Sequence, residues 1–159
     1  MTAAVASCGE ELFLNDTQAQ IVQQRIALLL LALHEEGYTD FCVNASAGIP
    51  LWTARIVMRM KKRFPVRLHL VCPHEEQARR WTEGLRNEYY SVHAQADSVT
   101  FAAPPDDPES YHRADEAMLS RSTLLLFYDK QGYVQYALPQ ETPYILTLAR
   151  LRGIEVQEI

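Results

Sequence analysis

Several features that mark common functional classes are missing from this sequence. Basic residues are not in excess: 15 Lys and Arg stand against 20 Asp and Glu, a formal net charge of -5. That balance argues against broad, non-specific nucleic-acid binding, which needs a basic face. The apolar run 27–33 is far shorter than a membrane span, and no signal peptide is visible. We therefore expect a cytoplasmic protein without a membrane or nucleic-acid partner.

Paired cysteines and metal motifs are missing too. Cys8, Cys42 and Cys72 form no C-x-x-C pair, and the histidines have no metal-ligand spacing. This pattern gives neither a disulfide framework nor a zinc site and fits a reducing compartment, so we predict no metal. Cys8 and Cys72 follow expected strands, where a thiol near a helix N-terminus can be reactive. Buried, unreactive cysteine is the commoner case.

The remaining composition is that of a globular protein. With 159 residues, of which 48% are hydrophobic, the chain is long enough for one domain with a sizeable core. No repeat, low-complexity tract or linker divides it, so we expect a single domain over residues 1–159. Strand-like and helix-like segments alternate. The expected strands are 2–7, 41–44, 67–72, 98–102, 122–128 and 154–159, and the expected helices are 17–36, 50–64, 74–94, 108–121 and 139–151.

This alternation predicts an α/β fold, a three-layer sandwich with a mainly parallel sheet and helices on both faces. Residues 10–15 are expected to form a loop. Thr17 to Gln20 matches a capping box at the start of the first helix, and the leucine run 28–31 indicates that this helix is buried on more than one side. The helix 108–121 is expected to bury Tyr111 along with its other apolar residues.

One stretch is the best candidate for a binding site. The apolar strand 41–44 is followed by the small-residue turn 45–48 and by a helix that begins near Pro50. Small residues let a ligand approach the backbone, and a helix N-terminus favours an anion such as phosphate. The alternative is a tight strand-to-helix crossover that needs small residues only for packing. The side-chain donors of Asn44 and Ser46 are more than such a crossover requires.

Three further positions carry two interpretations each. Glu75, after the strand 67–72, can orient a ribose hydroxyl or act as a general base, although acids in a first helical turn more often complement the helix dipole. Arg113 can pair with a phosphate in bidentate fashion or bridge to a neighbouring carboxylate. Trp81 is by default a core residue, and the alternative is a pocket wall that stacks on a base.

A series of segments then stands in a characteristic order. They are Gly48 to Arg55, then Pro73, Gln77 and Trp81, then Tyr111, Arg113 and Met118, and then the strand 124–128 with Asp129. In order and spacing they resemble the YpsA-like branch of the SLOG superfamily, including its patterns G-x-D-L-W-A-A-E and Y-x-x-R-N-x-x-M. The superfamily includes cytokinin-activating phosphoribohydrolases and the DNA-processing protein DprA. The resemblance implies a Rossmann-like fold and a nucleotide or nucleotide-derived ligand.

The sequence departs from the family pattern at several positions. Pro50 stands where an acid is usual, Arg55 where Glu is usual, and Ala114 where Asn follows the arginine. The phosphoribohydrolase loop P-G-G-x-G-T-x-x-E has no counterpart. These departures motivate the hypothesis of a non-enzymatic protein-interaction module whose pocket has decayed.

From the residues and the resemblance together, we expect a binding domain for a nucleotide or nucleotide-derived phosphorylated ligand, regulatory and not catalytic. The expected ligand-binding residues are Gly9, Asn44, Ala45, Ser46, Ala47, Gly48, Glu75, Arg113, Asp129 and Gly132. Besides the interaction module, the open alternative is an N-glycosidic (phosphoribo)hydrolase acting on a nucleoside monophosphate, which needs a carboxylate to stabilise an oxocarbenium-like state. A second copy of the chain, forming a homodimer, is a further candidate partner.

Overall fold

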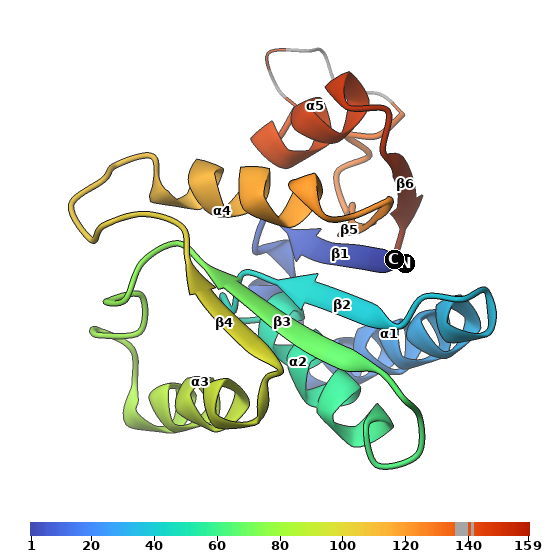
Figure 1. Ribbon diagram of the computed structural model, residues 1–159, viewed down its shortest axis with the longest axis horizontal. Coiled ribbons are helices and arrows are strands. Elements are labelled where there is room, and N and C mark those ends of the chain that lie inside the picture. Colours follow the sequence, from blue (N-terminus) through green and yellow to red (C-terminus); the bar gives the residue numbers. More distant parts are fainter. Residues whose placement is uncertain (136–139, 141) are drawn as a thin grey trace.

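The strands of the chain form a single parallel sheet in a computed structural model that describes residues 1–135, 140 and 142–159 (Figure 1). The order across the sheet is β4-β3-β2-β1-β5-β6. The strands are β1 (Thr2–Ser7), β2 (Asp40–Val43), β3 (Arg67–Cys72), β4 (Ser98–Phe101), β5 (Leu124–Tyr128) and β6 (Glu155–Glu158). The helices are the short 3₁₀ helix η1 (Glu10–Phe13) and α1 (Asp16–Glu35), α2 (Ile49–Met60), α3 (Glu83–Gln95), α4 (Ser110–Ser120) and α5 (Tyr144–Leu151).

Helices cover both faces of this sheet. Figure 1 shows α4 and α5 on one face and α1, α2 and α3 on the other. Each strand-to-strand connection therefore crosses over through a helix, as parallel pairing requires. The predicted fold class, a three-layer Rossmann-like α/β sandwich, is confirmed.

The alternation of side chains along the central strands explains the two layers of core. Along β1, Ala3 and Val5 belong to the cluster beneath α1 and α2, whereas Ala4 and Ala6 belong to the cluster beneath α4 and α5. Successive side chains of a strand point to opposite faces, so a strand covered on both sides must be apolar throughout. All five residues of β5 are buried for the same reason.

The strand order places a topological switch beside β1. From β1 the chain moves outward through β2, β3 and β4, and it then returns across the sheet to β5 on the other side of β1. Ser7 pairs with Tyr128 at the carboxyl ends of these two strands. Ligands of open parallel sheets bind outside the carboxyl ends of strands near such a switch.

The first helix differs from its expected cap and burial. Its capping box is formed by Asn15 and Gln18 and not by Thr17 and Gln20, because two overlapping polar patterns compete and the earlier one makes the reciprocal hydrogen bonds. The expectation of burial on more than one side is wrong. Leu28 is 69% exposed, because one stripe of α1 faces the sheet and the rest faces solvent.

Two further expectations are corrected, and a third falls partly outside the described residues. Residues 10–13 form η1 where a loop was expected. The helix expected over 74–94 begins only at Glu83, because the segment before it turns against the end of the sheet. The last helix begins at Tyr144 in the described residues, and residues 139 and 141 of its expected start lie outside them. No helix in the described part of the chain has the length and apolar character needed to cross a membrane.

The uneven burial of α1 predicts that substitutions on its two faces differ in their effect on stability. Leu28→Gln should change the free energy of unfolding by no more than about 0.5 kcal/mol, as for most exposed positions. Leu30→Ala should lower it by about 2–5 kcal/mol, because Leu30 is fully buried and truncation leaves a cavity. Urea denaturation of the two variants measures both values. Equal losses for the two variants would contradict this orientation of α1.

Candidate functional site

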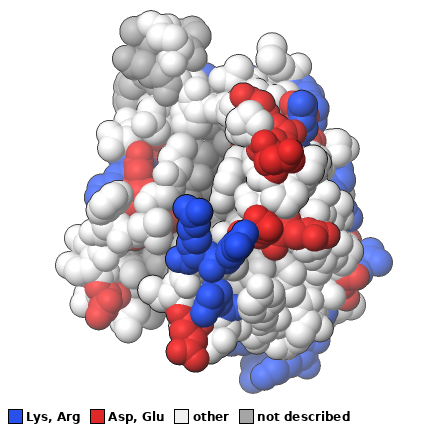
Figure 2. Space-filling view, turned by 90° about the vertical axis from the view of Figure 1, so that its left-hand side faces the viewer, with Lys and Arg blue, Asp and Glu red and all other residues white. Residues whose placement is uncertain are grey.

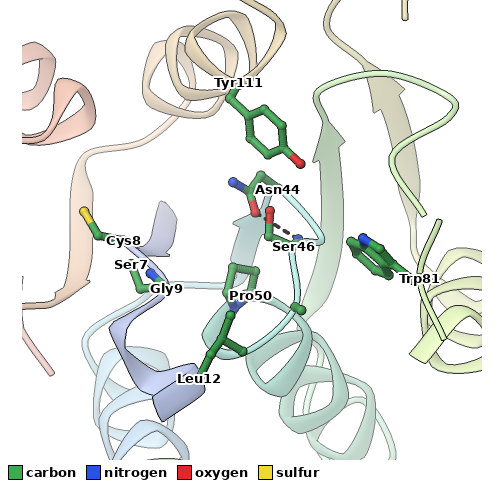
Figure 3. Close-up of a pocket in the computed structure, with 10 residues that line it drawn as sticks. Ser7, Cys8, Gly9, Leu12, Asn44, Ser46, Pro50, Trp81 and Tyr111 are labelled. Carbon is green, nitrogen blue, oxygen red and sulfur yellow. Dashed lines mark hydrogen bonds between the residues drawn. The ribbon is translucent and has the colours of Figure 1, made fainter. Parts of the chain in front are cut away.

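A cavity of about 330 Å³ opens at the carboxyl ends of β1 and β2 (Figure 3). Its walls come from the chain after β1, from η1, from the turn between β2 and α2, from the loop after β3 and from α4. The lining residues are Ser7, Cys8, Gly9, Leu12, Asn44, Ser46, Ala47, Pro50, Trp81 and Tyr111. The sheet topology therefore brings five separate segments to one site.

The turn 45–48 takes a left-handed path that sets the direction of its backbone groups. Asn44 Oδ1 accepts a hydrogen bond from the Ser46 N–H at 3.0 Å. Ala45 is fully buried with φ 60°, a conformation that costs an L-residue about 1 kcal/mol. Gly48 has φ 85° and ψ -135° at the N-cap of α2, which favours glycine. The N–H groups of Ala47 and Gly48 donate no hydrogen bond to the described residues.

A buried carboxyl group holds this turn against the end of β1. Glu11 on η1 is 1% exposed, and its Oε1 accepts hydrogen bonds from the Ser7 hydroxyl at 2.6 Å and from the Ile49 N–H at 3.0 Å. A Cβ on Gly48 would lie 2.5 Å from the same oxygen. The first N–H of α2 therefore already has an anionic partner within the chain. No local signal in the sequence pointed to Glu11, which stands in a stretch expected to be a loop.

A buried amide fixes the turn from the other side. Gln77, in the loop after β3, is 7% exposed, and its Nε2 donates to the Asn44 carbonyl at 3.0 Å and to Ser46 Oγ at 3.3 Å. This contact accounts for the late start of α3. The loop must pass across the end of the sheet for the amide to reach the turn, and tertiary contact overrides the helical pattern of the sequence.

Two aromatic side chains form the upper and lateral walls of the cavity. Figure 3 shows Tyr111 reaching from α4 toward Asn44 and Ser46, and Trp81 standing on the side opposite Cys8 and Gly9. The Trp81 ring also meets the Tyr89 ring edge-to-face, with centroids 5.3 Å apart. The expectation that Tyr111 is buried is wrong, since it is 46% exposed and lines the cavity.

The structure gathers some of the expected ligand-binding residues and disperses the others. Gly9, Asn44, Ser46 and Ala47 line the cavity, and Ala45 and Gly48 belong to the turn that forms its floor. Glu75 is exposed in the loop after β3 and does not line the cavity. Asp129 accepts hydrogen bonds from the Tyr133 and Val134 N–H groups in the turn after β5, which also contains Gly132 at φ 75°.

Helical geometry explains why Tyr111 and not Arg113 reaches the cavity. Residues two apart on a helix point in nearly opposite directions, whereas residues four apart share a face. Arg113 is accordingly exposed and lies 3.6 Å from Asp107 and 3.8 Å from Glu116. Asp115, four residues after Tyr111, is mostly buried. Burial raises the pKa of its carboxyl to about 7, and Glu116 adds to this effect while His112 opposes it.

The candidate thiols have raised pKa values. Partial burial and the surrounding carboxylates, first among them Glu10, raise the pKa of the Cys8 thiol to about 11. Burial likewise raises the pKa of Cys72 to about 11. Nucleophilic attack requires the thiolate, so neither thiol is activated at neutral pH. The structure favours the unreactive interpretation of both residues.

The cavity wall is uncharged, whereas the surface around it is of mixed sign. Among the described residues that line it, none is Lys, Arg, Asp, Glu or His. Figure 2 shows the face toward which β1, β2 and β3 run, with basic side chains near its centre and acidic ones on either side. Arg79 and Arg80 line a separate hollow that shares Trp81. In the described part of the chain, no group of three or more His, Cys, Asp or Glu is placed to hold a metal ion.

Comparison with known proteins places most of the chain in one protein family. A model of the YpsA family, described as the YspA SLOG family, matches residues 12–144. The chain belongs to the YpsA SLOG family. The matched range includes the turn 45–48, Gln77, Trp81 and Tyr111. The family therefore covers most of the segments that build the cavity.

Several curated relatives of this YpsA-family chain are similar over most of its length. It is 30% identical to a UPF0398 protein of Halalkalibacterium halodurans over 138 residues, 79% of this chain and 73% of that protein. It is 28% identical to the UPF0398 protein YpsA of Bacillus subtilis over 131 residues, 78% of this chain and 72% of that protein. A UPF0398 protein of Staphylococcus saprophyticus is 32% identical over 106 residues, 64% of this chain and 56% of that protein. These names state no activity or ligand.

The close approach of Glu11 to the turn predicts the effect of filling Gly48. Gly48→Ala should lower the free energy of unfolding by about 2 kcal/mol or more, because the methyl group meets a buried carboxyl and the backbone is left-handed. Gly84→Ala is the matched control. No atom lies within 4 Å of its added Cβ, and alanine in α3 should stabilise by up to about 1 kcal/mol. Chemical denaturation distinguishes the two, and a neutral Gly48→Ala would contradict the described packing.

The raised pKa of Asp115 predicts a pH-dependent stability. Between pH 3.8, the usual pKa of an aspartate, and about pH 7, the folded state keeps the carboxyl proton that the unfolded chain loses. Stability therefore falls as pH rises through this window, and the full cost is present above it. Asp115→Asn should raise the free energy of unfolding at pH 8 by on the order of a few kcal/mol and have little effect near pH 4. Exposed Asp106→Asn, the control, should leave the pH profile of the wild type unchanged.

Proposed function

We propose that this YpsA-family protein is a cytoplasmic binding domain for a nucleotide or nucleotide-derived ligand, which it holds in the cavity at the ends of β1 and β2. The proposal rests on one observation above all. The cavity lies beside the topological switch of a parallel sheet, and its walls combine two aromatic rings with polar groups of the turn 45–48. Aromatic faces and a few placed donors are the ordinary means of binding a planar heterocycle.

The composition of the wall favours binding over catalysis. Hydrolysis of an N-glycosidic bond needs a carboxylate beside the sugar to stabilise developing positive charge. None lines the cavity among the described residues, and the carboxyl groups of Glu75 and Asp129 are directed to solvent and to a local turn, respectively. The buried Glu11 carboxyl, which does not line the cavity, accepts hydrogen bonds from Ser7 and Ile49 through its Oε1. A regulatory binding domain fits these groups better than a hydrolase.

The cytoplasmic location of the protein is part of the same proposal. All three cysteines are free, and the two that are buried, Cys42 and Cys72, lie too deep in the core to pair at the surface. Unpaired cysteines are typical of proteins that remain in a reducing compartment.

Tyr111 offers a test that leaves the core intact, because its side chain is half exposed. Tyr111→Ala should weaken binding of a nucleotide-type ligand at least tenfold, since loss of one base–aromatic stack is worth about 1–3 kcal/mol. Tyr90→Ala is the matched control: Tyr90 is a similarly exposed tyrosine on α3 that does not line the cavity. Thermal-shift screening against AMP, ADP-ribose, NAD and NADP identifies the ligand, and calorimetry measures the loss.

The outcomes separate the three functional hypotheses. A thermal shift that Tyr111→Ala abolishes and Tyr90→Ala preserves supports the binding domain. Release of free base from any bound nucleotide would favour the hydrolase over the binding domain. No shift with any of these ligands would contradict the proposal and favour the protein-interaction module.

A further inference from the structure

We infer that the cavity receives the uncharged nucleoside part of the ligand, and that Glu11 keeps the ligand's phosphate away from the N-terminus of α2. This inference rests on the proposed function and narrows it. It also reverses the sequence-based expectation that the turn 45–48 cradles a phosphate.

The N-terminus of α2 already has its anion. The Ile49 N–H, the first backbone donor within α2, donates to Glu11 Oε1 at 3.0 Å. The Ser7 hydroxyl donates to the same oxygen at 2.6 Å. Glu11 is almost completely buried, and Gly48 leaves the room that its carboxyl occupies. A ligand phosphate at the Ile49 N–H would have to displace the buried Glu11 carboxyl from this hydrogen bond.

Other donors near the cavity are also taken within the chain. The Gly9 N–H donates to Ser7 Oγ at 3.3 Å, and the Ser46 N–H donates to Asn44 Oδ1 at 3.0 Å. Among the described residues that line the cavity or form the turn 45–48, the donors left without a partner are neutral. They include the Asn44 side-chain amide N–H groups, the Trp81 indole N–H, the Tyr111 hydroxyl and the backbone N–H groups of Ala47 and Gly48. The buried Oε2 of Glu11, which does not line the cavity, also has no hydrogen-bond partner. The neutral donors match the ring nitrogens and carbonyl oxygens of a nucleobase and the hydroxyls of a ribose.

The charges around the cavity also favour a neutral group over a phosphate. No cation lines the cavity among the described residues, and Glu10 and Glu11 carry negative charge close enough to Cys8 to raise its pKa. A phosphate placed in the cavity would face these two carboxylates without a compensating cation. A neutral nucleoside avoids this repulsion and still gains stacking on Trp81 and Tyr111.

The decisive experiment compares each nucleoside with its own 5′-monophosphate on the intact chain. Calorimetry with adenosine, guanosine, cytidine and uridine and with AMP, GMP, CMP and UMP supplies four such pairs. For the pair that binds, the nucleoside should bind at least as tightly as the monophosphate. A monophosphate that binds more than about tenfold tighter would overturn the inference while leaving the proposed function intact. If no nucleoside and no monophosphate binds although ADP-ribose, NAD or NADP does, the inference is overturned and the proposed function stands. If none of these ligands binds, both are overturned.

Glu11→Gln tests the role of the carboxylate itself. Removal of one nearby negative charge should move the preference toward the monophosphate by about tenfold, because like charges a few ångströms apart repel strongly in a partly buried site. Glu36→Gln is the control: it removes an exposed carboxyl at the end of α1 that does not line the cavity, and it should move the preference by less than about threefold. Equal shifts in the two variants, or none in Glu11→Gln, would overturn the role assigned to Glu11. The comparison in the wild-type protein decides the ligand class even if Glu11→Gln does not fold.

Discussion

The site is organised around one buried carboxyl group. Glu11 joins the end of β1, through the Ser7 hydroxyl, to the start of α2, through the Ile49 N–H. A buried carboxyl oxygen without hydrogen bonds is costly, and Oε1 of Glu11 has two donors, whereas its buried Oε2 has none. Two constraints follow from these contacts: η1 must fold back onto the strand, and residue 48 must be a glycine with a left-handed backbone. The floor of the cavity is the result.

The parallel sheet supplies the frame on which this contact is built. Because all strands run in one direction, their carboxyl ends meet at one edge, and the chain after β1, β2 and β3 converges there. Gln77 then bonds the turn after β2 from one side while Glu11 holds it from the other. Such a doubly held turn is preorganised, which lowers the entropy lost when a ligand binds.

Local patterns were a good guide to the strands and a poorer guide to the helices. The buried strands β1, β3 and β5 appear close to their expected bounds, since an apolar run between turn residues is a local signal. The start of α3 and the burial of α1 depend on which neighbours cover each side, and the sequence pattern does not carry that information. Of the candidate site, Asn44, Ser46 and Ala47 were found because a strand and a small-residue turn are adjacent in sequence.

The order of strands and helices, the fold class and the place of the turn 45–48 follow from the sequence alone, because periodicity and turn chemistry act over a few neighbouring residues. Only the tertiary structure decided which distant side chains complete the site. Tyr111 lines the cavity and Arg113 does not, because only one face of α4 is turned toward the cavity. Glu11 reaches the start of α2 because the chain after β1 folds back and brings residues 11 and 49 together. Contacts between residues far apart in the chain arise from packing, which no local pattern encodes.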